Sequence, residues 1–128
     1  MNFRQFLVSG MGILKYGPGL KAVVLIDPEI AKYSLALIPK YKNIQPQKYS
    51  AHITVVRLEK ETPQIEFWGK HEGEKVPFEY DAAIKSDGIY YFLDAYSKRI
   101  GDIREELGLS RYRVGFRSYH ISLGNIKE

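Results

Sequence analysis

The sequence contains no cysteine. This absence excludes disulfide bonds, thiolate metal sites and a cysteine nucleophile, and it fits a reducing compartment. A long apolar run is also missing. In residues 1–21, "MNFRQFLVSGMGILKYGPGLK", the residues Arg4, Gln5 and Lys15 interrupt the apolar stretch before a signal sequence or membrane span could form. We therefore expect a soluble, cytoplasmic protein that does not bind a membrane.

The composition predicts one globular domain over residues 1–128. The chain has 45% hydrophobic and 13% aromatic residues and no low-complexity tract. Its formal net charge is +4 at pH 7, which favours an anionic ligand over a cationic one. The composition indicates no obligate protein partner, and it leaves the oligomeric state open.

Histidine is scarce, yet two of the three histidines share one local pattern. Residues 51–56 read "AHITVV" and residues 119–124 read "YHISLG", so each histidine is followed by an apolar residue, a hydroxyl residue and another apolar residue. In a strand, residues i and i+2 point to the same face. His52 and Thr54 should therefore share one face, and His120 and Ser122 should do the same.

The elements that precede the two patterns also repeat. An apolar strand at 20–26 is followed by a helix that starts at Asp27 and Pro28, a polar loop at 40–50 and the His strand 51–58. A strand at 88–96 is followed by a helix at about 98–107, a basic loop at 110–118 and the His strand 119–126. This duplication predicts an α+β fold with two pseudo-symmetric lobes of sheet plus helix, in which the two His strands face a central cleft.

Two further segments of the middle of the chain resemble strands. Residues 64–69, "QIEFWG", and 75–86, "KVPFEYDAAIKS", flank the turn sequence "KHEGE" and could form a hairpin. His71 lies in that polar turn, and we expect it at the surface. Residues 1–19 could form either an extra strand or a flap over the cleft, and the sequence leaves both open.

A cleft lined by two imidazoles and two hydroxyls has definite chemistry. One imidazole can take a proton from an attacking oxygen while the other gives a proton to a leaving oxygen. The hydroxyls of Thr54 and Ser122 can donate to nonbridging phosphate oxygens. This chemistry requires neither a metal nor a cofactor. A zinc site built on His52 and His120 is the alternative, but no His, Asp or Glu cluster supports it and a hydroxyl is a poor zinc ligand.

The pair "HITV" (52–55) and "HISL" (120–123), each after a strand and a helix, resembles the signature of the two-histidine phosphoesterase superfamily, which has the LigT-like cyclic phosphodiesterase fold. The resemblance covers about Leu20 to Ile126. It implies that His52 and His120 are catalytic and that Thr54 and Ser122 hold the phosphate. The motif spacing and small size are most similar to the phage anti-CBASS-type subgroup, which cleaves cyclic oligonucleotides and would act in the host cytoplasm.

Aromatic and basic residues near the motifs are candidates for substrate binding. The rings of Tyr16, Tyr49, Trp68 and Tyr119 could stack on nucleobases, although Tyr119 should point away from the face of its neighbour His120. Arg117 lies in a loop that enters a His strand, where it could meet an anionic substrate. The same loops also contain Lys48, Arg111 and Arg113. The alternative for each of these residues is an ordinary place in the core or on the solvated surface.

These features favour a metal-independent phosphodiesterase that acts on nucleotides or oligonucleotides, such as cyclic oligonucleotide signals, 2',5'-linked oligoadenylates or 2',3'-cyclic phosphates. Two other classes stay open. A noncatalytic module could bind RNA or nucleotides in the same cleft. A structural or partner-binding protein could use both histidines for packing.

Overall fold

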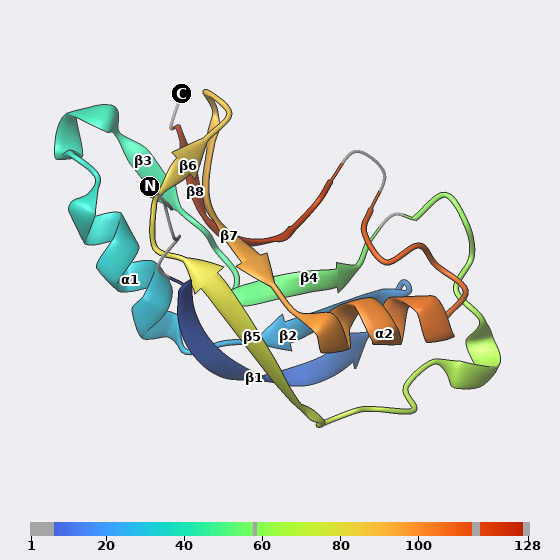
Figure 1. Ribbon diagram of the computed structural model, residues 1–128. Helices are drawn as coiled ribbons and strands as arrows, with labels where there is room; N and C mark the ends of the chain where they lie inside the picture. The colour runs from blue at the N-terminus through green and yellow to red at the C-terminus, as the bar shows by residue number, and fades with distance from the viewer. Residues whose placement is uncertain (1–6, 58, 114–115, 127–128) are drawn as a thin grey trace, which may run out of the picture.

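The computed structural model describes residues 7–57, 59–113 and 116–126, and these residues form a mixed α+β fold (Figure 1). The α+β class is confirmed. The strands and helices follow in the order β1 (Leu7–Gly17), β2 (Lys21–Leu25), α1 (Pro28–Leu37), η1 (Lys40–Lys42), β3 (Ile44–Pro46), β4 (His52–Val56), η2 (Ile65–Phe67), β5 (Lys75–Asp81), β6 (Lys85–Ser86), β7 (Tyr90–Tyr96), α2 (Lys98–Glu106) and β8 (Tyr119–Ile126), where η marks a 3-10 helix.

Six of the strands close into an antiparallel barrel. Strands β8, β4, β2, β1, β5 and β7 are neighbours in this order, and β7 also pairs with β8. The short strands β3 and β6 extend the sheet from β8 and β7. Closure pairs strand edges that an open sheet would leave exposed. The strands β4 and β8, which carry the two histidines, lie side by side, with Ile53 paired to Ile121.

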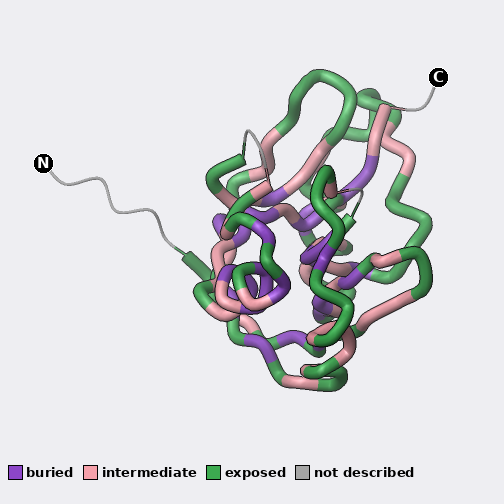
Figure 2. The backbone as a smooth tube through the Cα atoms, turned by 90° about the vertical axis from the view of Figure 1, so that its right-hand side faces the viewer, coloured by how far each residue is buried: buried purple, intermediate pink, exposed green. Residues whose placement is uncertain are grey.

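The core lies inside the barrel, because one face of each strand is apolar. Ile53 and Val55 of β4 and Ile121 and Leu123 of β8 are completely buried, whereas His52 and His120 on the alternate positions are only partly buried. Figure 2 shows the buried segments gathered in the centre of the molecule and exposed loops around them. Strand alternation therefore directs the motif residues to the outer face of the barrel.

The two helices begin where the sequence predicts. The Asp27 side chain accepts a hydrogen bond from the Glu29 amide at the start of α1, and the Ser97 hydroxyl accepts one from the Ile100 amide at the start of α2. Helix α1 packs beside β8, and α2 packs beside β5 and β4 (Figure 1). Neither helix is long and apolar enough to cross a membrane, as far as the described part of the chain shows.

Outside the repeated units, one of the two possibilities for residues 1–19, the extra strand, is present, whereas other expectations are not met. Residues 7–17 form β1, the strand between β2 and β5. The prediction of a strand at residues 64–69 is wrong. This segment contains η2, because the amides of Phe67 and Trp68 bond to carbonyls three residues earlier and the Gln64 amide bonds to the Leu107 carbonyl. The expected hairpin is therefore absent from the described residues, and β5 pairs with β1 and β7 instead.

The expected strand at 75–86 is interrupted. Strand β5 ends at Asp81, whose carboxylate accepts a hydrogen bond from the Ala83 amide, and β6 begins at Lys85. This local turn breaks the pairing between the two pieces. The His strand expected at 51–58 is β4, and its last expected residue, Leu58, lies outside the described residues. Positions 114 and 115 of the expected basic loop also lie outside them.

Candidate functional site

The four motif residues, His52, Thr54, His120 and Ser122, lie on one face of β4 and β8. In an antiparallel pair, the residues that flank Ile53 and Ile121 lie across from each other. His52 therefore lies across from Ser122, and Thr54 lies across from His120. Each imidazole thus has a hydroxyl residue beside it on its own strand and another on the facing strand.

The neighbouring strands β2 and β7 extend this arrangement into two rows of paired residues. Leu25 of β2 pairs with His52, and Phe92 of β7 pairs with Ser122, which gives one row across four strands. In the second row, Val23 of β2 pairs with Thr54, and Asp94 of β7 pairs with His120. An apolar side chain therefore lies next to His52 in its row, whereas a carboxylate lies next to His120.

A register shift follows each motif at the same position. The β2–β4 pairing skips Val55 directly after Thr54, and the β7–β8 pairing skips Leu123 directly after Ser122. Such bulges sharpen the twist of a strand and change the direction of nearby side chains. The carbonyl of Val55 accepts a hydrogen bond from the buried guanidinium of Arg104 at 2.7 Å, so α2 supports the end of the first motif strand.

A cavity of about 630 Å³ lies over this face and is lined by His52, His120 and Ser122. Its volume is within the range of ligand-binding cavities in proteins. The remaining lining residues are mostly aromatic or polar, namely Gln47, Tyr49, Arg57, Asp87, Tyr90, Tyr91, Phe92, Phe116, Gly124 and Asn125.

Two smaller cavities meet the same face. One of about 160 Å³ is lined by Thr54, His120, Ser122 and the basic residue Arg113, and one of about 400 Å³ is lined by His52, Thr54 and apolar residues of β2. Arg57 lines all three cavities. A guanidinium at this junction can bind a phosphate with paired hydrogen bonds.

The ring of His52 is oriented by the backbone. Its Nδ1 lies 2.7 Å from the carbonyl oxygen of Ser50, and because a carbonyl only accepts hydrogen bonds, Nδ1 carries the proton in this contact. The lone pair of the neutral ring is therefore on Nε2. This nitrogen can exchange a proton with a ligand in the cavity.

The ring of His120 is held by aromatic side chains and a carboxylate. Phe92 and Phe116 contact it edge-on, with ring centroids 4.8 and 5.1 Å away, and its Nε2 lies 3.5 Å from Asp94 Oδ1. Burial lowers the pKa of His120 and Asp94 opposes this shift, whereas Arg113 and Lys85 lower the pKa further. The neutral form of His120 is therefore favoured at neutral pH.

The expected substrate-binding residues lie in different places. Tyr49 is exposed and lines the cavity with His52. Tyr16 and Trp68 instead pack against each other edge-on, with ring centroids 4.9 Å apart, and they are absent from the residues that line the three cavities of this face. Their contact joins β1 to the segment after η2, and both side chains pack against the core.

Tyr119 is among the residues that line the cavity of about 160 Å³, and Arg117 lies in the loop before β8. Tyr119 is buried on the opposite face from His120, its hydroxyl donates to the Arg111 carbonyl at 2.6 Å, and burial raises its pKa to about 12. Arg117 is exposed and is not among the residues described as lining the cavities. Arg113 lines the cavity of about 160 Å³ and pairs with Glu59 at 3.4 Å, while Arg111 pairs with Asp102 and Glu105.

Sequence interpretation missed Asp94, Phe92 and Arg57. A signal for the first two exists in β7, where Phe92 and Asp94 alternate with the buried residues Leu93 and Ala95. Since the side chain of Asp94 is only 13% exposed, its charge needs a partner nearby. The signal for Arg57 is its place directly after the first motif strand.

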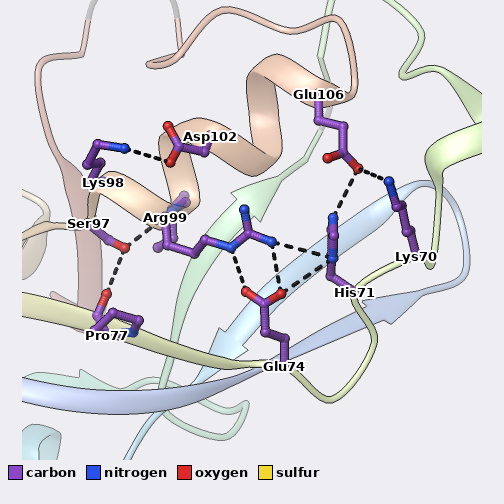
Figure 3. Close-up of polar contacts among 10 residues, drawn as sticks. Lys70, His71, Glu74, Pro77, Ser97, Lys98, Arg99, Asp102 and Glu106 are labelled. Atoms are coloured by element: carbon purple, nitrogen blue, oxygen red, sulfur yellow. Dashed lines mark hydrogen bonds and ion pairs between the residues drawn. The ribbon is translucent and has the colours of Figure 1, made fainter.

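His71 is not the surface residue that we expected. Its side chain is only 17% exposed, and its ring lies between Glu106, 3.0 Å from Nε2, and Glu74, 3.4 Å from Nδ1 (Figure 3). Arg99 of α2 binds Glu74 through two nitrogens, at 2.6 and 2.8 Å. This network ties α2 to the turn before β5.

The zinc site considered as an alternative would need a cluster of ligand side chains. Among residues 7–57, 59–113 and 116–126, no group of three or more His, Asp or Glu side chains is arranged to hold a metal ion. No family model, curated protein or solved structure matches this chain. The resemblance to the two-histidine phosphoesterases therefore rests on the two sequence motifs, and it stays a prediction.

Proposed function

We propose that this protein is a metal-independent phosphodiesterase that hydrolyses nucleotide or oligonucleotide phosphodiester bonds with His52 and His120 as an acid–base pair. One observation carries the proposal: two imidazoles and two hydroxyls lie on one face of adjoining strands, next to a cavity of about 630 Å³. A single partly buried histidine on a strand has no such implication, but a matched pair with matched hydroxyls does.

The proposed reaction follows from these groups. A water molecule, or a ribose hydroxyl next to the scissile bond, attacks phosphorus as one imidazole accepts its proton. The other imidazole, in its charged form, gives a proton to the leaving oxygen. The hydroxyls of Thr54 and Ser122 donate to the nonbridging oxygens, where negative charge increases in the transition state. Arg57, at the junction of the three cavities, offers a positive charge to the same oxygens.

The surroundings of the motifs suit a nucleotide. Tyr49, Tyr90 and Phe92 line the large cavity and can stack on bases, since every base has a π-face. Asn125 lines the same cavity and offers both a donor and an acceptor to the edge of a base. Cavities on both sides of His52 leave room for groups on both sides of the phosphate.

We infer that the chain is an internal duplication of the LigT-like type, with its two halves merged in one barrel. If β4 is exchanged with β8, β2 with β7 and β1 with β5, the set of neighbouring barrel strands stays the same: β4–β8 and β1–β5 map onto themselves, and the other pairs map onto one another. A helix lies between β2 and β4, and another lies between β7 and β8. The bulges after the two motifs also correspond.

The test is a screen in EDTA with 2',3'-cyclic nucleotides, 2',5'-linked oligoadenylates, 3',5'-cyclic dinucleotides and short RNA, followed by chromatography and mass detection. We expect turnover by the wild type and a loss of roughly 10²- to 10⁴-fold in His52→Ala or His120→Ala. The double variant should lose far less than the product of the two, because the pair acts as a unit. Thr54→Ala or Ser122→Ala should lose roughly 10- to 10³-fold.

His71→Gln is the matched control, because it removes the third histidine, which lies in a separate network. It should retain wild-type turnover as long as it folds. Equal turnover by the wild type and the His52→Ala, His120→Ala double variant would refute the mechanism. Salt-sensitive nucleotide binding without turnover, with affinity that survives His→Gln, would instead indicate a noncatalytic binding module.

A further inference from the structure

The two histidines of the site are chemically unequal, although their strands correspond. His52 pairs across the sheet with Leu25 of β2, and His120 pairs at the corresponding place with Asp94 of β7. The ring of His52 is oriented by the Ser50 carbonyl, which is neutral, whereas the ring of His120 faces a carboxylate. A carboxylate can stabilise a charged imidazole beside it, and a leucine cannot.

Asp94 is itself held in place. Its Oδ2 binds the ammonium group of Lys85, and its Oδ1 accepts a hydrogen bond from the Ser118 hydroxyl at 3.2 Å. The Asp94 side chain is only 13% exposed. Because two partners fix this carboxylate, it presents Oδ1 to His120 in one orientation. Phe92 and Phe116 hold the imidazole from its sides.

We propose that Asp94 is a positioning residue that orients His120 and makes it the base of the pair, with His52 as the acid. This inference rests on the proposed phosphodiesterase function. In the hydrolytic step, the oxygen of water bonds to phosphorus and its proton moves to His120. The bond from phosphorus to the leaving oxygen breaks, and that oxygen takes a proton from His52. Asp94 stabilises the imidazolium that forms on His120 and does not itself accept the proton.

The charges that face His120 agree with a neutral resting state. Asp94 favours its charged form, whereas burial, Lys85 of β6 and Arg113 of the segment before β8 all favour its neutral form, and burial is the largest of these effects. His52 and Arg57 line the large cavity with it. A base must be neutral before it accepts a proton, so this environment suits the assignment.

The first test needs no substrate. Side-chain NMR titration of the ¹⁵N-labelled protein follows each histidine in the wild type, in Asp94→Asn and in the control Asp102→Asn, which removes a carboxylate on α2. We expect Asp94→Asn to lower the midpoint of His120 and to leave that of His52 in place, because the lost anion favoured only the charged form of His120. Asp102→Asn should leave both midpoints unchanged. An unchanged midpoint of His120 in Asp94→Asn would overturn the inference.

The second test uses whichever substrate the screen identifies. We expect Asp94→Asn to lower kcat by roughly 10²-fold with little change in KM. A fall of this size is typical when a reactive group loses its correct position. The acidic limb of its kcat/KM profile should move to lower pH, whereas Lys85→Gln should move that limb to higher pH, because Lys85 opposes the charged form of His120. A purely structural role would lower activity without these opposite shifts.

Two further outcomes separate the inference from the proposed function. If the acidic limb of the wild type coincides with the NMR midpoint of His52 instead of His120, the assignment of the base is wrong while the phosphodiesterase stands. If no substrate is turned over, the phosphodiesterase and the base role both fail. A shifted His120 midpoint in Asp94→Asn would then still establish the pairing of the two side chains.

Discussion

Arg104 of α2 is the buried charge on which the first motif strand depends. It is 1% exposed, and its guanidinium donates at 2.7 Å to each of three oxygens: the carbonyls of Val55 and Ser110 and the carboxylate of Glu59. Val55 is the residue that the β2–β4 pairing skips. Arg104→Met keeps most of the side-chain volume and removes all three hydrogen bonds.

The expected loss in the free energy of unfolding comes from the Glu59 carboxylate, which stays buried after Arg104 is removed. Breaking a buried ion pair by removing one partner costs about 3–5 kcal/mol, because the other charge stays buried. Arg113 still lies 3.4 Å from Glu59, so we expect the lower end, about 3 kcal/mol. This is a large part of the roughly 5–15 kcal/mol that stabilises a domain. Urea denaturation, followed by tryptophan fluorescence and circular dichroism, measures the loss.

Two other variants show whether the loss of stability is specific to the buried charge of Arg104. Lys98→Met on the same helix removes an ion pair with Asp102 from a side chain that is 86% exposed, and it should change stability by about 1 kcal/mol at most. The double variant Arg104→Met, Glu59→Leu should be more stable than Arg104→Met alone, since the buried carboxylate is gone and Arg113, whose side chain is 38% exposed, keeps access to solvent. A loss for Arg104→Met no larger than that for Lys98→Met would refute the assigned role.

Two further predictions concern β8. Gly124→Ala should destabilise the protein by roughly 1–3 kcal/mol, because a Cβ there would lie 2.3 Å from the Gln45 carbonyl oxygen. A denaturation midpoint equal to that of Gly17→Ala, where a Cβ meets nothing closer than 3.7 Å, would contradict this. Burial raises the pKa of Tyr119 from 10.0 to about 12, so the unfolded chain loses the phenol proton first and the free energy of unfolding should fall as pH rises between these values. The difference from Tyr119→Phe should shrink over that range, and a constant difference would show that Tyr119 does not cause the fall.

Local features of the fold could be predicted because they depend on neighbours in the sequence. The starts of both helices follow from Asp27 and Ser97, whose side chains bond to amides two and three residues ahead. Residues 64–69 differ from the predicted strand because of a contact with a distant part of the chain. Its apolar and aromatic residues suit a strand, but the Gln64 amide bonds to the distant Leu107 carbonyl, and the segment turns into η2.

In the candidate site, too, local features can be predicted from the sequence and long-range contacts cannot. The alternation of β4 and β8 already assigns the four motif residues to one face of each strand, and Ile53 and Ile121 to the other. For Tyr16 and Trp68, only the chemistry of their rings suggests a role in binding. Nothing in their neighbours in the sequence indicates that they pack against each other.

The sequence by itself determined the repeated motifs, the face that each presents and the ends of the helices, because these depend on backbone periodicity and on contacts within a few residues. Only the tertiary structure decided that β4 lies beside β8, that Asp94 reaches His120 and that Arg104 is buried beneath the first motif strand. These contacts join residues far apart in the chain. Their partners are chosen by how the barrel closes, which no local pattern specifies.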